Sequence, residues 1–295
     1  MVADEKFNVK YAEYQNYFNL QLNKLLSEVS TVPPVLAESM KYSLQLGGKR
    51  IRPVLAYAVG DVLGVSREKI TPFACALEFI HTYSLIHDDL PEMDNDDYRR
   101  GKPSNHKVYG CANAILAGDG LLNTAYSILF SECFKGNEFV SASKCICDCA
   151  GIYGMIAGQS ADILHEHDET VDEDTLEYIY ENKTAKLIVA PIIVPSVLSG
   201  GAYYSELKQF GKRLGYLFQL TDDLLDATGS FEELGKTTGK DEKGGKLTAV
   251  KVYGIDKSRL LVDLVGDECH KILDGVHSDV SFLHSLVNFV KSRVN

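Results

Sequence analysis

The chain has 295 residues, of which 45% are hydrophobic, and its 30 basic and 41 acidic side chains give a formal net charge of −11. The apolar fraction is ample for a folded core, which excludes an intrinsically disordered chain. The acidic balance excludes nucleic acid as the main partner, because binding to a phosphate backbone requires a basic face. A phosphate ligand would therefore have to be held by a local cluster of cations or by a metal ion.

The first residues contain no basic segment followed by an apolar run, so we expect no signal peptide. The longest apolar run, 187–198, contains Pro191 and Pro195 and is too short to span a bilayer. We therefore expect a cytoplasmic protein without a membrane span.

Hydrophobic periodicity predicts helices along the whole chain, and no segment has the pattern of a strand. In the first half, the expected helices are 7–29, Pro33-Pro34 to Leu46, 51–63 with Gly64 as its C-cap, and Thr71-Pro72 through Asp89, followed by a polar loop at 92–106. In the second half, they are 110–134, 138–166, 173–200 with Asp172 as N-cap, 204–228, 257–274 and 279–293, with a loop rich in glycine and lysine over 229–247. No repeat or linker interrupts them, so we predict one all-α domain over residues 1–295, a bundle of about ten or more helices.

An acidic cluster begins where one of these apolar helices runs into the loop at 92–106. Its five carboxylates belong to Asp88, Asp89, Asp94, Asp96 and Asp97. Like charges repel and an ionised carboxylate is costly to desolvate, so a multivalent cation is the simplest partner that keeps them together. Ligands that are all oxygen favour Mg²⁺ over zinc. On this stretch alone, a solvated acidic loop remains the alternative.

A second acidic cluster, Asp222-Asp223-x-x-Asp226, closes another apolar helix. Asp222 and Asp226 are four residues apart, so they share a helix face and both can reach one ion. If the two helix ends faced each other, their carboxylates would clamp a metal-bound diphosphate. A carboxylate di-iron bundle fits less well, because it requires Glu-x-x-His pairs in the middle of helices.

Basic residues gather at three junctions. Gly47-Gly48-Lys49-Arg50-Ile51-Arg52-Pro53 lies between two predicted helices, where glycines let backbone N–H groups approach an anion. Arg99-Arg100-Gly101-Lys102 follows the first acidic cluster, and the lysines of the 229–247 loop follow the second. Each junction by itself could be solvated surface, but together they predict two anion sites.

These motifs, in this order, resemble those of the trans-isoprenyl diphosphate synthases (the polyprenyl synthetase family), most of all the bacterial farnesyl diphosphate synthase type. The resemblance covers nearly the whole chain. It rests on the junction at 47–53, the run His-x-x-Ser-Leu-Ile-His-Asp-Asp-Leu-Pro-x-Met-Asp at 81–94, Arg99 to Pro103 with His106, Gly158-Gln159 with Asp162, Lys183-Thr184, Phe218-Gln219 with the second acidic cluster, and the loop at 236–246. The chain departs from the family at Ala185, where glycine is usual, and at Ala249-Val250, where Tyr-Pro is usual.

The resemblance implies an isoprenoid synthase fold around a central cavity and a transfer reaction. Isopentenyl diphosphate would condense with dimethylallyl or geranyl diphosphate to give farnesyl diphosphate, with about three Mg²⁺ ions per site and Mn²⁺ as an alternative. The metal ligands would be Asp88, Asp94 and Asp222, supported by Asp89, Asp223 and Asp226. The allylic diphosphate would be bound by Arg99, Lys183, Thr184, Gln219, Lys236 and Lys246, and isopentenyl diphosphate by Gly48, Lys49, Arg52, His81 and Arg100.

The same resemblance implies the catalytic roles. Asp88, Asp94 and Asp222 would hold the Mg²⁺ that, together with Lys183, stabilises the leaving diphosphate, while Thr184 and Gln219 would line the allylic carbocation with oxygen dipoles. Tyr83 and Ser84, about one helical turn before Asp88, would set product length, and the bulk of Tyr83 favours a C15 product. A homodimer is implied by resemblance only.

Three alternatives stay open at this point. A geranylgeranyl diphosphate synthase with a C20 product is the nearest, since Tyr83 can also serve only core packing. A terpene cyclase fits less well, because it needs one diphosphate site and here a separate group of cations is present. A non-catalytic partner subunit fits less well still, because both acidic clusters are intact.

Overall fold

The structure is a computed structural model that describes residues 5–27, 32–168, 172–228 and 245–294. It confirms the predicted all-α fold. The elements of the first half are α1 (Glu5–Ser27), α2 (Pro34–Gln45), α3 (Ile51–Leu63), α4 (Arg67–Asp88), β1 (Tyr98–Arg99), β2 (Lys102–Pro103), α5 (Asn105–Tyr109) and α6 (Cys111–Cys133). Those of the second half are α7 (Asn137–Ala150), α8 (Met155–Leu164), α9 (Glu173–Ile179), a π-helix η1 (Tyr180–Ala185), α10 (Lys186–Leu198), α11 (Tyr204–Thr228), α14 (Ala249–Asp274), α15 (Ser281–Lys291) and a 3₁₀ turn η2 (Ser292–Val294).

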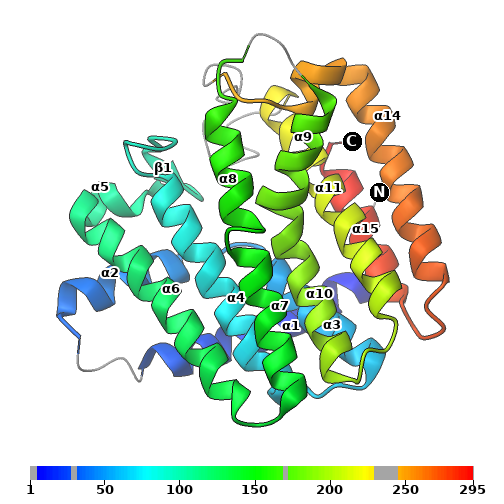
Figure 1. The fold of residues 1–295 in the computed structure, drawn as a ribbon, viewed down its shortest axis with the longest axis horizontal. Helices are drawn as coiled ribbons and strands as arrows, with labels where there is room; N and C mark the ends of the chain where they lie inside the picture. The colour runs from blue at the N-terminus through cyan, green and yellow to red at the C-terminus, as the bar shows by residue number, and fades with distance from the viewer. Residues whose placement is uncertain (1–4, 28–31, 169–171, 229–244, 295) are drawn as a thin grey trace.

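The helices pack around α4 and α10. Helix α10 is apolar on nearly every side and contacts α3, α4, α7 and α11, while α4 packs against α3 and α6. Figure 1 shows α2, α5 and α6 on one side of this centre and α11, α14 and α15 on the other. Burial of these apolar faces against one another is the main stabilising contribution to the bundle.

Helix α4 begins earlier than predicted, at Arg67 instead of Thr71-Pro72. The hydroxyl of Ser66 accepts a hydrogen bond from the backbone N–H of Lys69 at 3.4 Å and so caps the helix. Pro72 lies inside the second turn, where it removes one backbone hydrogen bond that this cap and the buried apolar face outweigh.

The segment predicted as one helix over 138–166 is two helices. The break falls at Gly151–Gly154, and a side chain at Gly154 would lie 2.1 Å from the carbonyl oxygen of Cys149. By length and composition alone the segment Asn137–Leu164 could cross a membrane, which by itself is weak support for a span, and 39% of its apolar window is buried inside the protein.

Other boundaries also differ from the prediction. The segment 173–200 is divided into α9, η1 and α10, and the helix predicted from 257 begins at Ala249, with a break at Gly254 where φ is 77°. The polar loop at 92–106 contains the β1–β2 hairpin and the start of α5, so the expectation of no strands was wrong. Gly64 as a left-handed C-cap and Asp172 as an N-cap are confirmed. Most of the loop predicted at 229–247 lies outside the described residues.

Candidate active site

The C-terminal ends of α4 and α11 face each other across a cavity of about 190 Å³. Asp88 and Asp94 line it from one side and Asp222 and Asp223 from the other. Asp94 reaches the cavity because the chain turns back after α4, and the backbone N–H of Asp94 donates to the carbonyl oxygen of Asp88 at 2.8 Å. The two acidic clusters predicted to meet therefore lie in one place.

Asp88 and Asp94, the two carboxyls of the first cluster that line this cavity, have pKa values shifted in opposite directions. Burial raises the pKa of Asp88 to about 6, although Lys183 acts against this shift. Burial would also raise the pKa of Asp94, but Lys246 and Lys183 outweigh it and hold this pKa below its ordinary value. Lys246 Nζ lies 2.9 Å from Asp94 Oδ1. The surroundings of Asp88 thus disfavour its charged form, and an added cation would favour it.

Asp89 does not line the cavity, but it binds Arg99, which does. Its carboxylate accepts a hydrogen bond from Arg99 Nε at 3.0 Å, and Asp96 lies 3.5 Å from the same guanidinium. Asp89 is 2% exposed. Burial raises the pKa of Asp89, while the charge of Arg99 opposes that shift. The pair therefore fixes Arg99, at the β1–β2 hairpin, in the cavity wall.

In the second cluster the three aspartates have three different environments. Asp222 lines both this cavity and a larger one next to it, and its Oδ1 lies 2.6 Å from Arg293 Nη2. Asp223 is 3% exposed and accepts the backbone N–H of Ala249 at 2.7 Å, the amide of Gln219 at 2.9 Å and the hydroxyl of Tyr180. Asp226 is buried one turn further on and is not among the described residues that line either cavity.

Lys183 and Thr184 enter the site from the π-helix η1. A π-helix is a wide turn that occurs often at functional sites, and here both side chains line the two cavities. Lys183 Nζ lies 2.5 Å from Asp162 Oδ2, and the Thr184 hydroxyl donates to Gln219 Oε1 at 2.6 Å. Helix α8 can approach this turn because residue 158 is glycine: a side chain there would meet the backbone nitrogen of Lys183 at 2.0 Å.

The larger cavity has a volume of about 690 Å³ and extends from the acidic clusters along α4. Such a volume is in the range of small-molecule sites. Tyr83 and Ser84 both line it, as predicted for residues that limit product length, and Tyr83 is only 7% exposed. The Tyr83 ring packs edge-on against His87 with 5.7 Å between ring centres, and Ser84 Oγ donates to the carbonyl oxygen of His81 at 3.0 Å. Phe218, one turn before Asp222 on α11, lines the opposite side.

Two of the five residues predicted to bind a second diphosphate, Arg52 and His81, line this larger cavity. Burial together with Arg52 and Arg100 places the pKa of His81 well below its ordinary value. Arg100 donates to the carbonyl oxygen of Gly47. A side chain at Gly48 would lie 2.6 Å from the Arg100 guanidinium carbon, and the φ of 118° at this residue favours glycine. Burial, and next the charge of Arg293, lower the pKa of Lys49.

Both departures from the family pattern have a structural explanation. Ala185 packs against Gly215 of α11, where a second side chain would lie 2.4 Å from the Ala185 Cα, so glycine on the partner helix leaves room for the methyl group. At Ala249 it is the backbone N–H that binds Asp223 and Tyr180, and a change of side chain does not remove that donor. Of the predicted site residues, Lys236 lies outside the described residues.

Two residues of the site had no assigned role in the sequence. Asp162 is 4% exposed and lies between two lysines, 2.5 Å from Lys183 and 3.9 Å from Lys246. Arg293 comes from the last turn of the chain, and its guanidinium lies 4.9 Å from the centre of the Phe218 ring as well as against Asp222. Asp162 belonged to a recognised motif, whereas nothing in the local sequence marks Arg293.

The oxygen donors of the small cavity suit a hard divalent cation that is shared with a ligand. Among the described residues, no group of three or more carboxylate, histidine or cysteine side chains is close enough to hold a metal ion by itself. Mg²⁺ is commonly bound through one or two carboxylates plus substrate phosphates. Asp88, Asp94 and Asp222 in one cavity, with cations beside it, fit that mode of binding.

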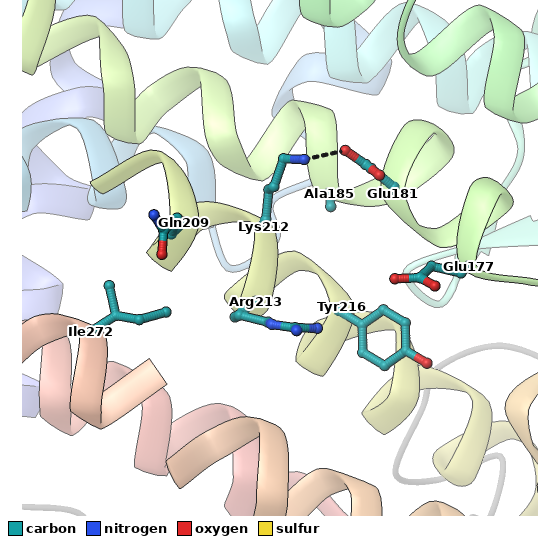
Figure 2. Close-up of a pocket in the computed structure, with 8 residues that line it drawn as sticks. All are labelled: Glu177, Glu181, Ala185, Gln209, Lys212, Arg213, Tyr216 and Ile272. Carbon is teal, nitrogen blue, oxygen red and sulfur yellow. Dashed lines mark ion pairs between the residues drawn. The ribbon is translucent and has the colours of Figure 1, made fainter. Parts of the chain in front are cut away.

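A separate polar pocket of about 280 Å³ lies between α11, η1 and α14 (Figure 2). Its cations have acidic partners: Lys212 lies 2.6 Å from Glu181, and Arg213 lies 3.1 Å from Glu268. Neither acidic cluster lines this pocket in the described part of the chain. Asp88, Asp222 and Lys183 instead line the two cavities between α4 and α11.

Comparison with known proteins agrees with this site. The family profile described as polyprenyl synthetase matches residues 33–274. A geranylgeranyl pyrophosphate synthase of Capsicum annuum is 40% identical over 99% of this chain and 81% of its own length, and a farnesyl diphosphate synthase of Micrococcus luteus is 39% identical over 95% and 96%. A Helicobacter pylori geranyltransferase complexed with magnesium and isoprenyl diphosphate superposes with a TM-score of 0.82, at 30% identity and 96% coverage of both chains.

The all-α fold around two acidic helix ends defines the class of the protein, a prenyltransferase of the trans-isoprenyl diphosphate synthase type. The chain belongs to the polyprenyl synthetase family.

Proposed function

We propose that the protein is a Mg²⁺-dependent prenyltransferase that condenses isopentenyl diphosphate with dimethylallyl or geranyl diphosphate to give farnesyl diphosphate. The proposal is carried by one observation: the two acidic helix ends converge on a small polar cavity that opens beside a larger, mostly apolar one. A diphosphate and a prenyl chain need these two environments next to each other.

In this proposal the cations around the small cavity bind the allylic diphosphate. Arg99 and Lys183 line that cavity, and each has a buried carboxylate that orients it. Lys246 lies between Asp94 and Asp162. The charged groups stabilise negative charge as it develops on the leaving diphosphate, which lowers the barrier to ionisation. When bound, Mg²⁺ would offset charge on the same oxygens; the number of ions, about three, and the use of Mn²⁺ are parts of the proposal.

The allylic carbocation would form where Thr184 and Gln219 line both cavities. The Thr184 hydroxyl donates to Gln219 Oε1, so its own lone pairs remain to stabilise a cation. Isopentenyl diphosphate, held by Lys49, Arg52, His81 and Arg100 with the backbone at Gly48, would attack through its double bond. A proton would then leave carbon, and the released diphosphate would accept it as the base.

Product length is the finer part of the proposal. Tyr83 is buried in the wall of the larger cavity one turn before Asp88, which supports an early stop and a C15 product. The Micrococcus luteus farnesyl diphosphate synthase supports the same product, while the Capsicum annuum geranylgeranyl pyrophosphate synthase supports a C20 product equally. Geranylgeranyl diphosphate synthase is therefore the second candidate function.

We also propose a cytoplasmic homodimer in which residues 1–295 act as one domain. Large apolar side chains are exposed along α6–α8, among them Phe130, Phe134, Ile152, Tyr153 and Leu164 at 67% or more. Exposed apolar groups of this size are typical of protein interfaces. Support for a single domain comes from the buried core, which runs continuously from α1 to α15.

One assay tests the reaction and its product. The purified protein is incubated with Mg²⁺, isopentenyl diphosphate and either dimethylallyl or geranyl diphosphate, and the products are separated by chain length. Farnesyl diphosphate as the main product supports the proposal, and a C20 main product selects the second candidate. Turnover of geranyl diphosphate without isopentenyl diphosphate would identify a cyclase, and no turnover with either primer would identify a non-catalytic subunit.

A further inference from the structure

Helix α1 carries a polar stripe beside its buried face. The buried face consists of Phe7, Tyr14, Phe18, Leu22 and Leu26. Next to it run three polar residues at a spacing of four, Tyr11, Gln15 and Asn19. Residues four apart lie one above the other on a helix, so the three side chains form one row.

Each member of the row contacts one residue of the junction at 48–50, between α2 and α3. Tyr11 Oη donates to the carbonyl oxygen of Lys49 at 2.5 Å, Gln15 Nε2 donates to that of Gly48 at 2.9 Å, and Arg50 Nε donates to Asn19 Oδ1 at 3.2 Å. Three successive turns of α1 therefore hold three successive residues of the junction.

These contacts fix the direction of the backbone N–H groups. In a trans peptide the carbonyl and the N–H of the following residue point in opposite directions. Because the carbonyls of Gly48 and Lys49 point to α1, the N–H groups of Lys49 and Arg50 point away from it. The φ angles of Gly47, Gly48 and Arg50 are positive, at 81°, 118° and 51°, while that of Lys49 is not. Such an alternation of backbone conformations is of the kind in which successive N–H groups surround an anion.

The Arg50 side chain is occupied in holding this conformation. Its Nη1 lies 2.5 Å from Glu78 Oε1 and its Nη2 donates to the carbonyl oxygen of Leu44 at 2.5 Å. Glu78 is 2% exposed and lies one turn before His81 on α4. By contrast, the buried Nε of Arg52 has no hydrogen-bond partner within the described ranges. A buried donor without a partner is expected where a ligand supplies the acceptor.

We propose that the row Tyr11–Gln15–Asn19 is a positioning element that holds Gly48-Lys49-Arg50 in the conformation that binds the diphosphate of isopentenyl diphosphate. The row touches the junction and not the substrate. The inference rests on the proposed function, which assigns the second diphosphate to this junction. It extends that function to α1, which lies outside the residues 33–274 that the family profile matches.

The test compares Michaelis constants for the two substrates in variants of the row. Tyr11→Phe, Gln15→Leu and Asn19→Leu each remove one hydrogen bond, and each should raise KM for isopentenyl diphosphate about 3-fold, with about 20-fold for the triple variant. KM for geranyl diphosphate should stay within about 2-fold of the wild-type value, because the small cavity does not depend on α1. Gln21→Leu is the matched control: Gln21 lies on the same helix but faces a cavity lined by Pro72 and Ile128.

The outcomes separate the inference from the function on which it rests. A triple variant with an unchanged KM for isopentenyl diphosphate, or with both KM values raised equally, would overturn the role of the row. If the triple variant fails to fold, as judged by circular dichroism, Tyr11→Phe decides, since it removes a single oxygen atom from a partly exposed residue. Absence of isopentenyl diphosphate turnover in the wild type would instead refute the proposed function.

Discussion

The two acidic clusters are built alike although they come from helices far apart in the chain. In each Asp-Asp pair the first aspartate lines both cavities, and the second is buried in contacts with the protein, although Asp223 also borders the small cavity. Asp88 and Asp222 line both cavities, whereas Asp89 binds Arg99 and Asp223 binds Tyr180 and the start of α14. The repeated pair therefore separates two tasks: the first carboxylate is available to a ligand and the second fixes a neighbouring segment.

The clusters differ in what they hold. Asp89 anchors the hairpin that carries Arg99, a cation in the cavity wall. Asp223 anchors Ala249, which directly follows Leu247 and Thr248, and these two residues also line the cavity. The first cluster thus positions a ligand-binding side chain, and the second closes one wall of the site.

The largest expected effect follows from neutralising the first member of each pair. Asp88→Asn and Asp222→Asn should each lower kcat/KM for geranyl diphosphate on the order of 10³-fold, because each removes a carboxylate that would hold the Mg²⁺ needed to stabilise the leaving diphosphate. The thermal unfolding midpoint of the metal-free Asp88→Asn protein should not fall, since burial disfavours the charged form of Asp88. Near-normal turnover in either variant would contradict the assignment.

Neutralising the second aspartate of each pair should mainly reduce the stability of the fold and should lower catalysis less. Asp89→Asn removes the nearer of the two carboxylates paired with Arg99, leaving only Asp96 at 3.5 Å, and should reduce the free energy of unfolding by about 2 kcal/mol. Asp223→Asn weakens hydrogen bonds to Tyr180 and Ala249 and should cost about 2 kcal/mol. Urea titration measures both, and kcat/KM should fall less than in the first pair of variants. If Asp89→Asn were as stable as the wild type and as inactive as Asp88→Asn, the division of tasks would be wrong.

Substitution of Tyr83, one turn before the first cluster, should change the rate least but should alter the length of the product. Tyr83→Ala removes the ring from the wall of the larger cavity and should shift products from C15 toward C20, with kcat within about 10-fold of wild type. Tyr83→Phe keeps the ring and should keep the C15 product. Product chromatography with geranyl diphosphate as primer measures the shift, and an unaltered profile in Tyr83→Ala would exclude Tyr83 as the limit.

Much of this site follows from local sequence. Helical periodicity and glycine or proline boundaries predicted α3, α6, α11 and α15 closely, because apolar spacing and caps are local properties. The prediction failed at Pro72 inside α4, at the break before Met155 and at the π-helix at Lys183. The Ser66 cap and the approach of Gly154 to the Cys149 carbonyl are local, whereas the wide turn at Lys183 lies against Gly158 of α8 and so depends on another helix.

The sequence by itself determined the all-α class, the two Asp-Asp motifs and the cations beside them, because residue type and spacing carry that information. Only the tertiary structure decided which carboxylate of each pair faces the cavity, that Asp162 lies between two lysines, and that Arg293 reaches Asp222 from the last turn of the chain. It also decided that α1 holds the junction at 48–50. These facts depend on the packing of helices distant in sequence, which local spacing does not encode.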